Sequence, residues 1–330
     1  MAFPNVNVTD IIATTIQNRS KKVADNVTKS SALYAKLNQR GNVKSFSGGN
    51  IILQELSFQE NANAGWYSGY DLLPTAAQDV ISAAEYTIKQ LACPVVMSGL
   101  EDLQNSGPEA FIDLMEGRIA VAEATMVNRL AAGVYADGTG SGGKELTGLN
   151  AAVPIDPTLG TYGGIARTTG SLGASFWRSG IVDVNNSVST VTPVQEALNL
   201  AWSARVVGAE RPDLIPMDAS FWNNYVLELQ AQQRFTDPKT ASFGFPTIKF
   251  MDADVVLDGG IGGFCPALTA FLLNTKYIFL RPHSRRNMVP LSPNKRVSIN
   301  QDADVQIIAW AGNMASNGTR YQARVIDTRS

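Results

Sequence analysis

The sequence predicts an α+β protein with two layered domains. Two kinds of pattern support this prediction: helical stripes of apolar residues, the longest within 109–135, and short runs of apolar and β-branched residues such as 271–280. The length of 330 residues is a third indication, because it exceeds what one hydrophobic core commonly holds. With 45% hydrophobic and 17% charged residues, the composition is that of an ordinary folded chain.

The first segment, Val8 to Leu37, has apolar residues at irregular helical spacing among Ser, Thr, Asn and Lys. This pattern predicts a helical or partly helical arm. Its apolar positions are too few to form a core of their own. We therefore expect the arm to lie against another body.

A long β-hairpin is predicted next. Residues 46–60 are rich in apolar and β-branched residues, residues 61–65 have the composition of a turn, and a second strand would begin at 66–70. An isolated two-stranded ribbon is marginally stable in water, so its aromatic side chains need a partner. We expect a second subunit to cover them, with a fold-back onto the same domain as the alternative. The candidate intersubunit contacts are Phe58, Trp66, Tyr67 and Tyr70.

The rest of the chain mixes helices and strands. Residues 82–98 alternate like a strand, with Pro94 as a break, and 109–135 repeat apolar residues every three or four positions, which predicts a long helix. We expect the last three strands to share a sheet with the strand near 85–92. The further predicted elements are helices at 194–207 and 217–234 and strands at 213–216, 249–257, 271–280, 304–310 and 319–326.

The residues that could carry catalysis are few. Cys93 and Cys265 form no C-x-x-C pair, which disfavours a metal knuckle or a redox motif, and we expect two buried thiols. His283 is the single histidine, so a catalytic triad or a multi-histidine metal site has too few ligands, and we expect a solvated loop histidine. The sequence therefore predicts neither an enzyme nor a cofactor.

One string resembles a nucleotide-binding loop. Residues 138–144 match G-x-x-x-x-G-K, but Glu145 stands where the motif needs Ser or Thr for magnesium. The string also follows a predicted helix, whereas a phosphate-binding loop follows a strand and opens a helix. We interpret it as a connector.

Charge is distributed unevenly along the chain. Residues 1–44 and 281–330 each carry a net charge of +5, whereas residues 45–280 carry −12. Basic ends commonly face a polyanion or an acidic partner surface, although plain solvated faces remain the alternative. The candidate residues for contact with a polyanion or an acidic partner are Arg19, Lys21, Lys22 and Lys29.

Transport signals are not apparent. No run of about 18–20 apolar residues is present, so we expect no membrane-spanning segment. Residues 1–10 have neither a basic nor an apolar stretch typical of a signal peptide. We therefore expect no export by a cleaved signal and no membrane partner.

Several strings occur in an order that resembles one family. They are G148-L-N-A-A-V153, then T161-Y-G-G-I-A-R-T-T169, then F176-W-R178, supported by the strings at 84–99 and 304–317. In this serial order the chain resembles the major capsid proteins of tailed bacteriophages, which have the fold of phage Hong Kong 97. The resemblance covers nearly the whole chain, and no single string is diagnostic.

The resemblance implies a Hong Kong 97-like architecture. It has an N-terminal arm, an extended β-hairpin loop, a long spine helix, a discontinuous peripheral domain and an α/β axial domain. Mapped onto this sequence, they are the arm at 1–40, the loop at 41–75, the spine helix at 107–137, the peripheral domain at 76–150 and 270–330, and the axial domain at 151–269.

The resemblance also implies a function. Hexamers and pentamers of the chain would assemble, in the host cytoplasm, into the icosahedral head of a virion that encloses double-stranded DNA. The implied partners are a separate scaffolding protein, a portal, a decoration protein and the DNA, bound without sequence specificity. The founding member crosslinks its subunits through a loop lysine, but no lysine occurs here between Lys44 and Lys89, so we expect no crosslinking. The alternatives are an encapsulin shell or another virion structural protein.

Overall fold

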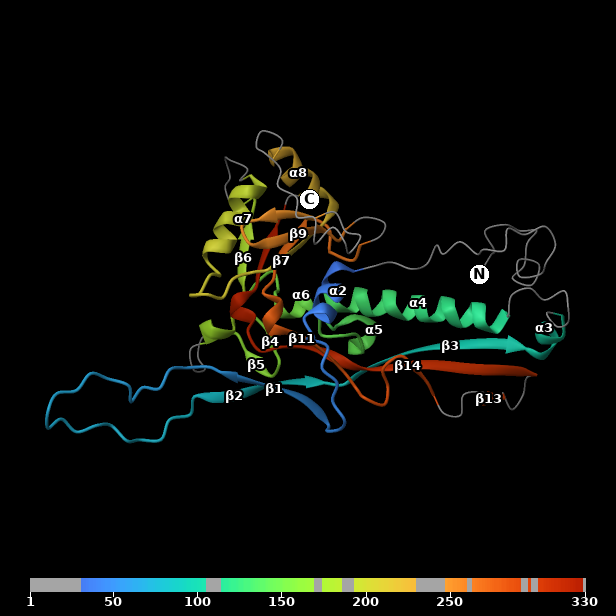
Figure 1. The fold of residues 1–330 in the computed structure, drawn as a ribbon, viewed down its shortest axis with the longest axis horizontal. Helices are drawn as coiled ribbons and strands as arrows, with labels where there is room; N and C mark the ends of the chain where they lie inside the picture. The colour runs from blue at the N-terminus through green and yellow to red at the C-terminus, as the bar shows by residue number, and fades with distance from the viewer. Residues whose placement is uncertain are drawn as a thin grey trace.

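The computed structural model describes residues 31–104, 114–168, 174–185, 193–229, 247–259, 263–291, 296–297 and 302–328. These residues form an α+β fold, as expected from the sequence. Figure 1 shows three parts: a lobe built on one sheet, an elongated layer in which a long helix lies along a narrow sheet, and a loop that projects at the end of the molecule opposite to α3 (Gly99–Gln104). No helix among the described residues is long and apolar enough to cross a membrane.

The elongated layer consists of the long helix α4 (Leu114–Tyr135) and a sheet centred on β14 (Ala303–Ser316). One edge of β14 pairs antiparallel with β3 (Lys89–Ser98) along ten residues. The other edge pairs with three shorter strands, β11 (Ile278–Pro282), β12 (Val289–Pro290) and β13 (Arg296–Val297). The short helix α3 (Gly99–Gln104) follows β3 at the far end of the layer.

The apolar stripe of α4 packs on this sheet. Ala122, Met126 and Leu130 are buried together with Val95 of β3 and Trp310 of β14. The three helix residues are four positions apart, so they share one face. The helix predicted at 109–135 is thus confirmed over 114–135, and its expected start lies outside the described residues.

Pro94 does not break its strand. It lies inside β3, opposite Ile307 of β14. Among the described strands β3 pairs with β14 alone, so the prolyl nitrogen sits in an edge strand, where the missing N–H costs no ladder bond. The prediction of a break was wrong because sequence alone does not tell an edge strand from a central one.

The lobe is built on a six-stranded sheet. The helices α7 (Val194–Ser203) and α8 (Ala219–Leu229) pack against it, as Figure 1 shows. The first turn of α7 is capped by Glu228 of α8, whose carboxylate accepts from the amides of Val194 and Gln195 at 2.9 and 2.8 Å. The strand order is β6 (Gly180–Asp183), β15 (Ala323–Ile326), β10 (Thr269–Leu272), β7 (Leu214–Met217), β9 (Ala253–Leu257) and β8 (Thr247–Phe250).

Both faces of this sheet are covered. Ile215, Val255 and Leu272 pack against the helices α7 and α8. Residues adjacent to them in sequence, such as Leu214 and Phe271, point to the opposite face and join the central core. A sheet buried on both sides explains the continuous apolar runs in these strands.

Two strand predictions need correction. Residues 249–257 form not one strand but the hairpin β8–β9, with its turn at Met251 and Asp252. Residues 271–280 contain the end of β10 and most of β11, which belong to different sheets. The 3₁₀ helix Thr275–Tyr277, capped by the side chain of Asn274, turns the chain between them.

The expected grouping of the last three strands is confirmed for β11 and β14, which share a sheet with β3, but is wrong for β15. β14 pairs with β3 and β11, whereas β15 lies in the lobe beside β6 and β10. Gly318 and the 3₁₀ helix Thr319–Tyr321 redirect the chain between them. Strand pairing depends on such turns rather than on apolar content.

The described end of the arm packs on its own chain. Ser31 caps the helix α2 (Ala32–Gln39), and its hydroxyl donates to Asp258 at 3.3 Å. The ammonium of Lys36 lies 2.8 Å from the carboxylate of Asp254. Residues 1–30 of the predicted arm lie outside the described residues.

Candidate assembly surface

The projecting loop starts from a two-stranded ribbon that is held against the body. β1 (Ile51–Ser57) pairs antiparallel with β2 (Ile81–Thr87), and their inward residues include Ile52 and Tyr86, which face each other and are buried. The second strand of the hairpin therefore lies at 81–87, and its predicted position at 66–70 is wrong.

Tyr86 ties this ribbon to the elongated layer. Its hydroxyl donates to the carbonyl oxygen of Ser316 at 2.7 Å and accepts from the Ser316 amide at 3.1 Å. Burial raises the pKa of Tyr86 to about 12, because the phenolate would lose its solvation. The neutral hydroxyl is thus the form that holds the ribbon.

A small hairpin supports the ribbon from the side. β4 (Thr161–Tyr162) and β5 (Ile165–Ala166) are joined by Gly163 and Gly164, both with positive φ (58° and 74°), as a tight two-residue turn requires. The carbonyl of Gly163 accepts from the Glu85 amide at 2.9 Å. A Cβ atom on Gly163 would lie 2.9 Å from the side chains of Ala84 and Tyr86, so only glycine fits this approach.

Aromatic rings continue the support. The ring of Tyr162 lies 5.3 Å from that of Tyr86 and 6.1 Å from that of Trp177, centroid to centroid. The indole Nε1 of Trp177 donates to the carbonyl of Tyr162 at 2.9 Å. Trp177 ends the 3₁₀ helix Ala174–Trp177 and is fully buried.

Arg167 completes the support. Its guanidinium donates to the carbonyls of Ala151 and Ala152, at the end of the short helix α6 (Leu149–Ala152), at 2.9 and 2.7 Å. It also lies over the ring of Tyr162, and burial lowers its pKa. The described residues of the strings that carried the family resemblance, 148–153, 161–168 and 176–178, thus support the ribbon at the base of the loop.

Beyond the ribbon the loop continues without a regular ladder. The Phe58 amide donates to the carbonyl of Val80 at 3.2 Å, and the Gln59 side chain to that of Asp79 at 2.6 Å. Farther out, the side-chain amide of Asn63 donates to the carbonyl of Ala76 at 2.5 Å. The two legs of the loop therefore run side by side as far as residues 63 and 76.

The tip of the loop, residues 64–75, contains a local turn. The Ser68 amide donates to the Asp71 carboxylate at 2.8 Å, and the Asp71 amide donates to the Ser68 carbonyl at 3.0 Å. Gly69 has a φ of 47°, a left-handed conformation that a strand does not contain. This turn explains why the aromatic residues 66–70 do not form a strand.

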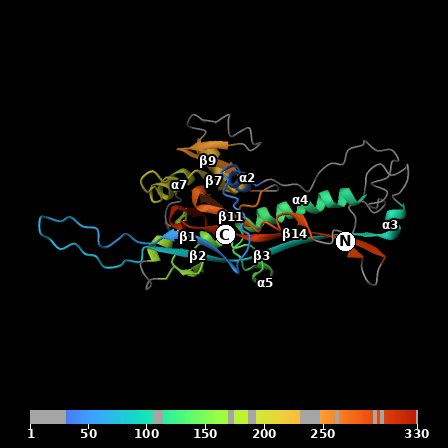
Figure 2. The same ribbon diagram turned by 60° about the horizontal axis from the view of Figure 1, so that its bottom comes forward.

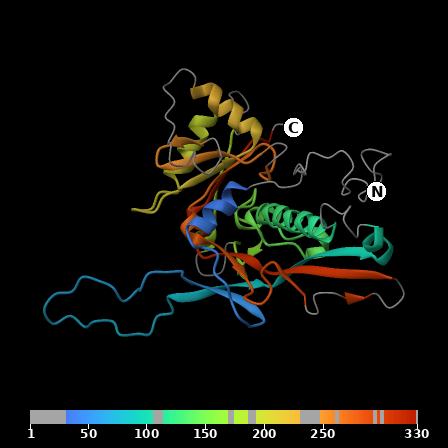
Figure 3. The same cartoon turned by 45° about the vertical axis from the view of Figure 1, so that its right-hand side comes forward.

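The tip exposes a group of large apolar side chains. Trp66 and Tyr70 are completely exposed, and Tyr67 is 67% exposed. Leu72 and Leu73 add further exposed apolar surface. In Figures 1, 2 and 3 the loop extends away from both other parts. The tip therefore does not fold back onto its own chain.

Phe58 differs from the other three predicted contact residues. It is partly buried against the central core, and its ring lies 6.1 Å from that of Phe176. The structure thus places Phe58 at the base of the loop and the other three at its tip. The predicted basic residues Arg19, Lys21, Lys22 and Lys29 lie outside the described residues.

The single histidine and the two cysteines form no catalytic or metal-binding cluster among the described residues. His283 packs its ring against Phe46, at 5.1 Å, and its Nδ1 accepts from the Arg285 amide. Both cysteines are free; Cys265 is buried as expected, but Cys93 is only partly buried. Among the described residues, no group of three His, Cys, Asp or Glu side chains could hold a metal ion.

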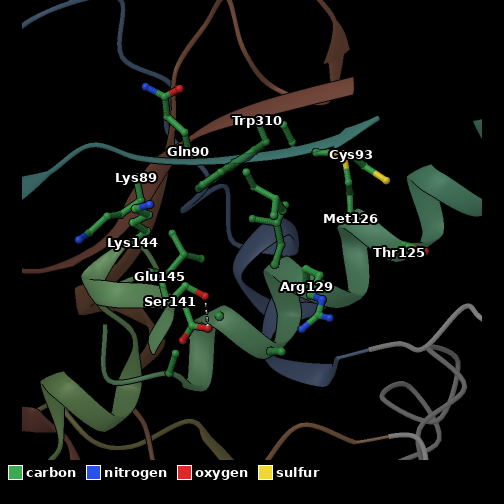
Figure 4. A pocket seen from close by; sticks show the side chains of 17 residues that line it. Lys89, Gln90, Cys93, Thr125, Met126, Arg129, Ser141, Lys144, Glu145 and Trp310 are labelled. Carbon is green, nitrogen blue, oxygen red and sulfur yellow. Dashed lines mark hydrogen bonds between the residues drawn. The ribbon is translucent and has the colours of Figure 1, made fainter. Parts of the chain in front are cut away.

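The sequence did not predict a pocket of about 590 Å³ between β3 and α4. The turn at 140–146, which includes the short helix α5 (Gly140–Gly143), closes one side. Figure 4 shows Lys89 and Lys144 near one end and Arg129 farther along the helix. Lys144 belongs to the string that resembled a nucleotide-binding loop. In the structure that string follows the end of α4 and contains only the four-residue helix α5.

Comparisons with known proteins place the fold. No family model matches the sequence, and no curated protein sequence matches it either. The structure of the capsid asymmetric unit of cyanophage A-1(L) matches with a TM-score of 0.67 and 15% identity, over 96% of this chain and 97% of that chain. The chain has a capsid-protein fold. This is the Hong Kong 97-like fold that the resemblance implied, and that prediction is confirmed.

Two further structures share this capsid-protein fold. The capsid of a native GTA particle has a TM-score of 0.56 and 12% identity, covering 94% of this chain and 95% of that one. An encapsulin complex from Synechococcus elongatus has a TM-score of 0.57 and 8% identity, covering 94% and 91%. The likeness covers more than nine tenths of both chains in each case.

Proposed function

We propose that this chain is the major capsid protein of a tailed bacteriophage, which builds the icosahedral head of a virion around double-stranded DNA. The observation that carries the proposal is the loop tip, whose aromatic side chains project into solvent from a firmly held base. Aromatic residues at the centre of an interface contribute on the order of 2 kcal/mol or more each. The same tip, repeated in every copy, supplies a contact that a closed shell can use many times.

The proposed role is structural, and it includes further partners. Hexamers and pentamers would form the shell in the host cytoplasm, with a separate scaffolding protein, a portal and a decoration protein, and the DNA would bind through nonspecific contacts. The predicted domain boundaries are part of the same proposal. The likeness to capsid structures supports it through the fold, and the DNA-facing and scaffold-facing roles are supported only by the charge of the chain ends.

Substitution of Trp66 tests the proposed function. Trp66→Ala removes the largest exposed side chain of the tip and nothing that the subunit packs inside, so the subunit should fold normally but fail to form shells. Electron microscopy of the expressed chain with its scaffold gives the readout, and Trp66→Phe, which keeps an aromatic ring, should retain shells. Intact shells from Trp66→Ala would contradict the proposal.

The basic end of the chain allows a separate test of the nucleic-acid or scaffold contact. Replacing Lys21 and Lys22 by Gln removes two positive charges from a segment of net charge +5. Weaker DNA packaging or slower assembly, measured by particle density in a gradient, is the expected result. Unchanged packaging and assembly would remove this role from the proposal.

An encapsulin-type shell is the second candidate, because an encapsulin complex has the same fold. The two candidates differ in content. Purified particles of a phage head contain DNA that resists nuclease, whereas the alternative predicts protein cargo and no DNA. Ultraviolet absorbance ratios and gel analysis of the particle contents distinguish them.

A further inference from the structure

The pocket between β3 and α4 is a gap in the packing of the helix on the sheet. Leu91, Cys93 and Val95 alternate along β3, so they point to the same side, toward α4. Val95 is buried there, but Leu91 and Cys93 are only partly buried. On the helix side, Ala132 and Gly133 carry too little side chain to cover them. The gap of about 590 Å³ has the volume of an ordinary small-molecule site.

The wall of the pocket is apolar. Leu91 and Trp310 on the sheet and Met126 and Leu130 on the helix line it. Trp310, Met126 and Leu130 belong to the core between the sheet and the helix, so the rest of that core holds them in place. An apolar wall of this kind favours an apolar group, because water is released when the group is buried against it.

The mouth of the pocket is basic. Lys89, Arg129 and Lys144 line it together with a single acid, Glu145. Arg129 and Lys144 are exposed. In the described part of the chain the salt bridges involve other cations, so none of these three is bound to a carboxylate. Glu145 accepts from the hydroxyl of Ser141 at 3.4 Å, the dashed line in Figure 4. The mouth therefore has positive charge to offer to a ligand.

We propose that this pocket binds a small amphipathic anion, namely one apolar chain that ends in a carboxylate or phosphate head. The chain would lie along Leu91 and Met126, and the head would face Arg129 and Lys144 at the mouth. A guanidinium presents paired N–H donors to either head, and an ammonium adds a point charge. The site lies within one subunit, so this inference goes beyond the proposed function and does not rest on it.

Charge and shape separate this ligand from the alternatives. A cationic amphiphile would meet repulsion at the mouth, and a neutral chain would gain nothing from its charges. Inorganic phosphate alone would leave the apolar wall uncovered. A nucleotide needs backbone amides at the start of a longer helix to hold its phosphates, and the four-residue α5 does not provide them.

Protection of a cysteine that the chain already has tests the proposal. Cys93 lines the pocket and is partly exposed, whereas Cys265 is buried. Unassembled full-length subunits are alkylated with iodoacetamide, and mass spectrometry gives the rate at each cysteine. Sodium decanoate or decyl phosphate, at about ten times its dissociation constant, should slow alkylation of Cys93 by on the order of tenfold, because only the free pocket reacts. Decyltrimethylammonium and inorganic phosphate should leave the rate unchanged.

Two matched double variants test the role of the mouth. Arg129→Glu with Lys144→Glu reverses two exposed charges at the pocket and should abolish protection by both anions. Arg285→Glu with Arg286→Glu reverses two exposed charges outside the pocket and should keep it. Equal protection in both double variants would overturn the assignment of the head to the mouth.

Thermal unfolding gives a second readout that does not depend on the reactivity of the thiol. A ligand that bridges the sheet and the helix stabilises the folded subunit, so the unfolding temperature should rise with decanoate or decyl phosphate concentration. The anion that acts at the lower concentration identifies the head, and with it a fatty acid or a phospholipid fragment as the source. If neither anion protects Cys93 or raises the unfolding temperature, or if decyltrimethylammonium acts equally, the proposal is wrong.

Discussion

The base and the tip of the projecting loop are built on opposite principles. At the base, Tyr86 and Trp177 are buried, and the hydroxyl of one and the indole N–H of the other donate to backbone carbonyls of the same chain. At the tip, Trp66 and Tyr70 are as large and as apolar, yet both are completely exposed. The aromatic side chains of the base therefore stabilise the folded subunit, whereas those of the tip contribute free energy only when another molecule buries them. Aromatic content alone does not distinguish the two roles.

The largest effect on stability should come from the base. Trp177→Ala leaves a cavity where the indole is fully buried and should lower the free energy of unfolding by about 3–5 kcal/mol. Trp66→Ala removes the same side chain from the tip and should change it by less than about 0.5 kcal/mol. Urea unfolding of the two unassembled subunits measures both. A similar decrease in the free energy of unfolding in both variants would contradict the distinction between base and tip.

Removing only the hydroxyl of Tyr86 should destabilise the base by less than removing the indole of Trp177. Tyr86→Phe leaves the buried carbonyl and amide of Ser316 without their partner, which should cost about 1–3 kcal/mol at pH 8.

The same substitution has a pH dependence of known sign. The folded chain holds the pKa of Tyr86 at about 12, above the ordinary value of 10.0, so the unfolded chain loses this proton first as the pH rises. The contribution of the protonated Tyr86 hydroxyl to the free energy of unfolding is fully present below about pH 10. It declines between about pH 10 and about pH 12, by at most about 1.4 kcal/mol per pH unit. The stability gap between wild type and Tyr86→Phe should therefore narrow across this window. A constant gap would show that Tyr86 is not protected from ionisation.

Among the predicted changes at the base, the smallest concerns Gly164, one of the paired glycines of the β4–β5 turn. Gly164→Ala meets only the backbone cost of a positive φ, about 1–2 kcal/mol, because its nearest neighbour, the Glu85 side chain, lies at an ordinary 3.7 Å. Gly163→Ala has the same backbone cost and also presses on Ala84 and Tyr86. Thermal unfolding should rank Gly163→Ala as the more destabilised variant, and the reverse order would mean that the turn does not support the ribbon.

Some of this architecture is readable in the sequence. The long helix is predicted because its apolar residues repeat every three or four positions, and a short buried strand is predicted at 213–216, where the structure has one at 214–217. The exposed aromatic residues of the tip are also found, because no adjacent sequence could cover them. These features depend on local periodicity and composition.

The wrong predictions concern features that depend on turn geometry or on contacts between segments far apart in the sequence. The string 66–70 has strand composition, but the Ser68–Asp71 turn and the left-handed Gly69 prevent a strand. Phe58 has the same residue type as a contact residue, yet it packs near Phe176, more than a hundred positions away in the sequence. The sequence does not predict the pocket under β3 because its residues come from four separate segments. Only the three-dimensional pairing of those segments creates it.

The most direct test compares the solvent exposure of the tip before and after assembly. Hydroxyl-radical footprinting, read by mass spectrometry, reports side-chain modification for Trp66, Tyr67 and Tyr70 in unassembled subunits and in purified shells. If the tip is the assembly contact, these residues should be modified strongly in the subunit and be protected several-fold in the shell, while the buried Trp177 stays unmodified in both. Equal modification of the tip in subunits and shells, or a tip already protected in the subunit, would contradict the claim.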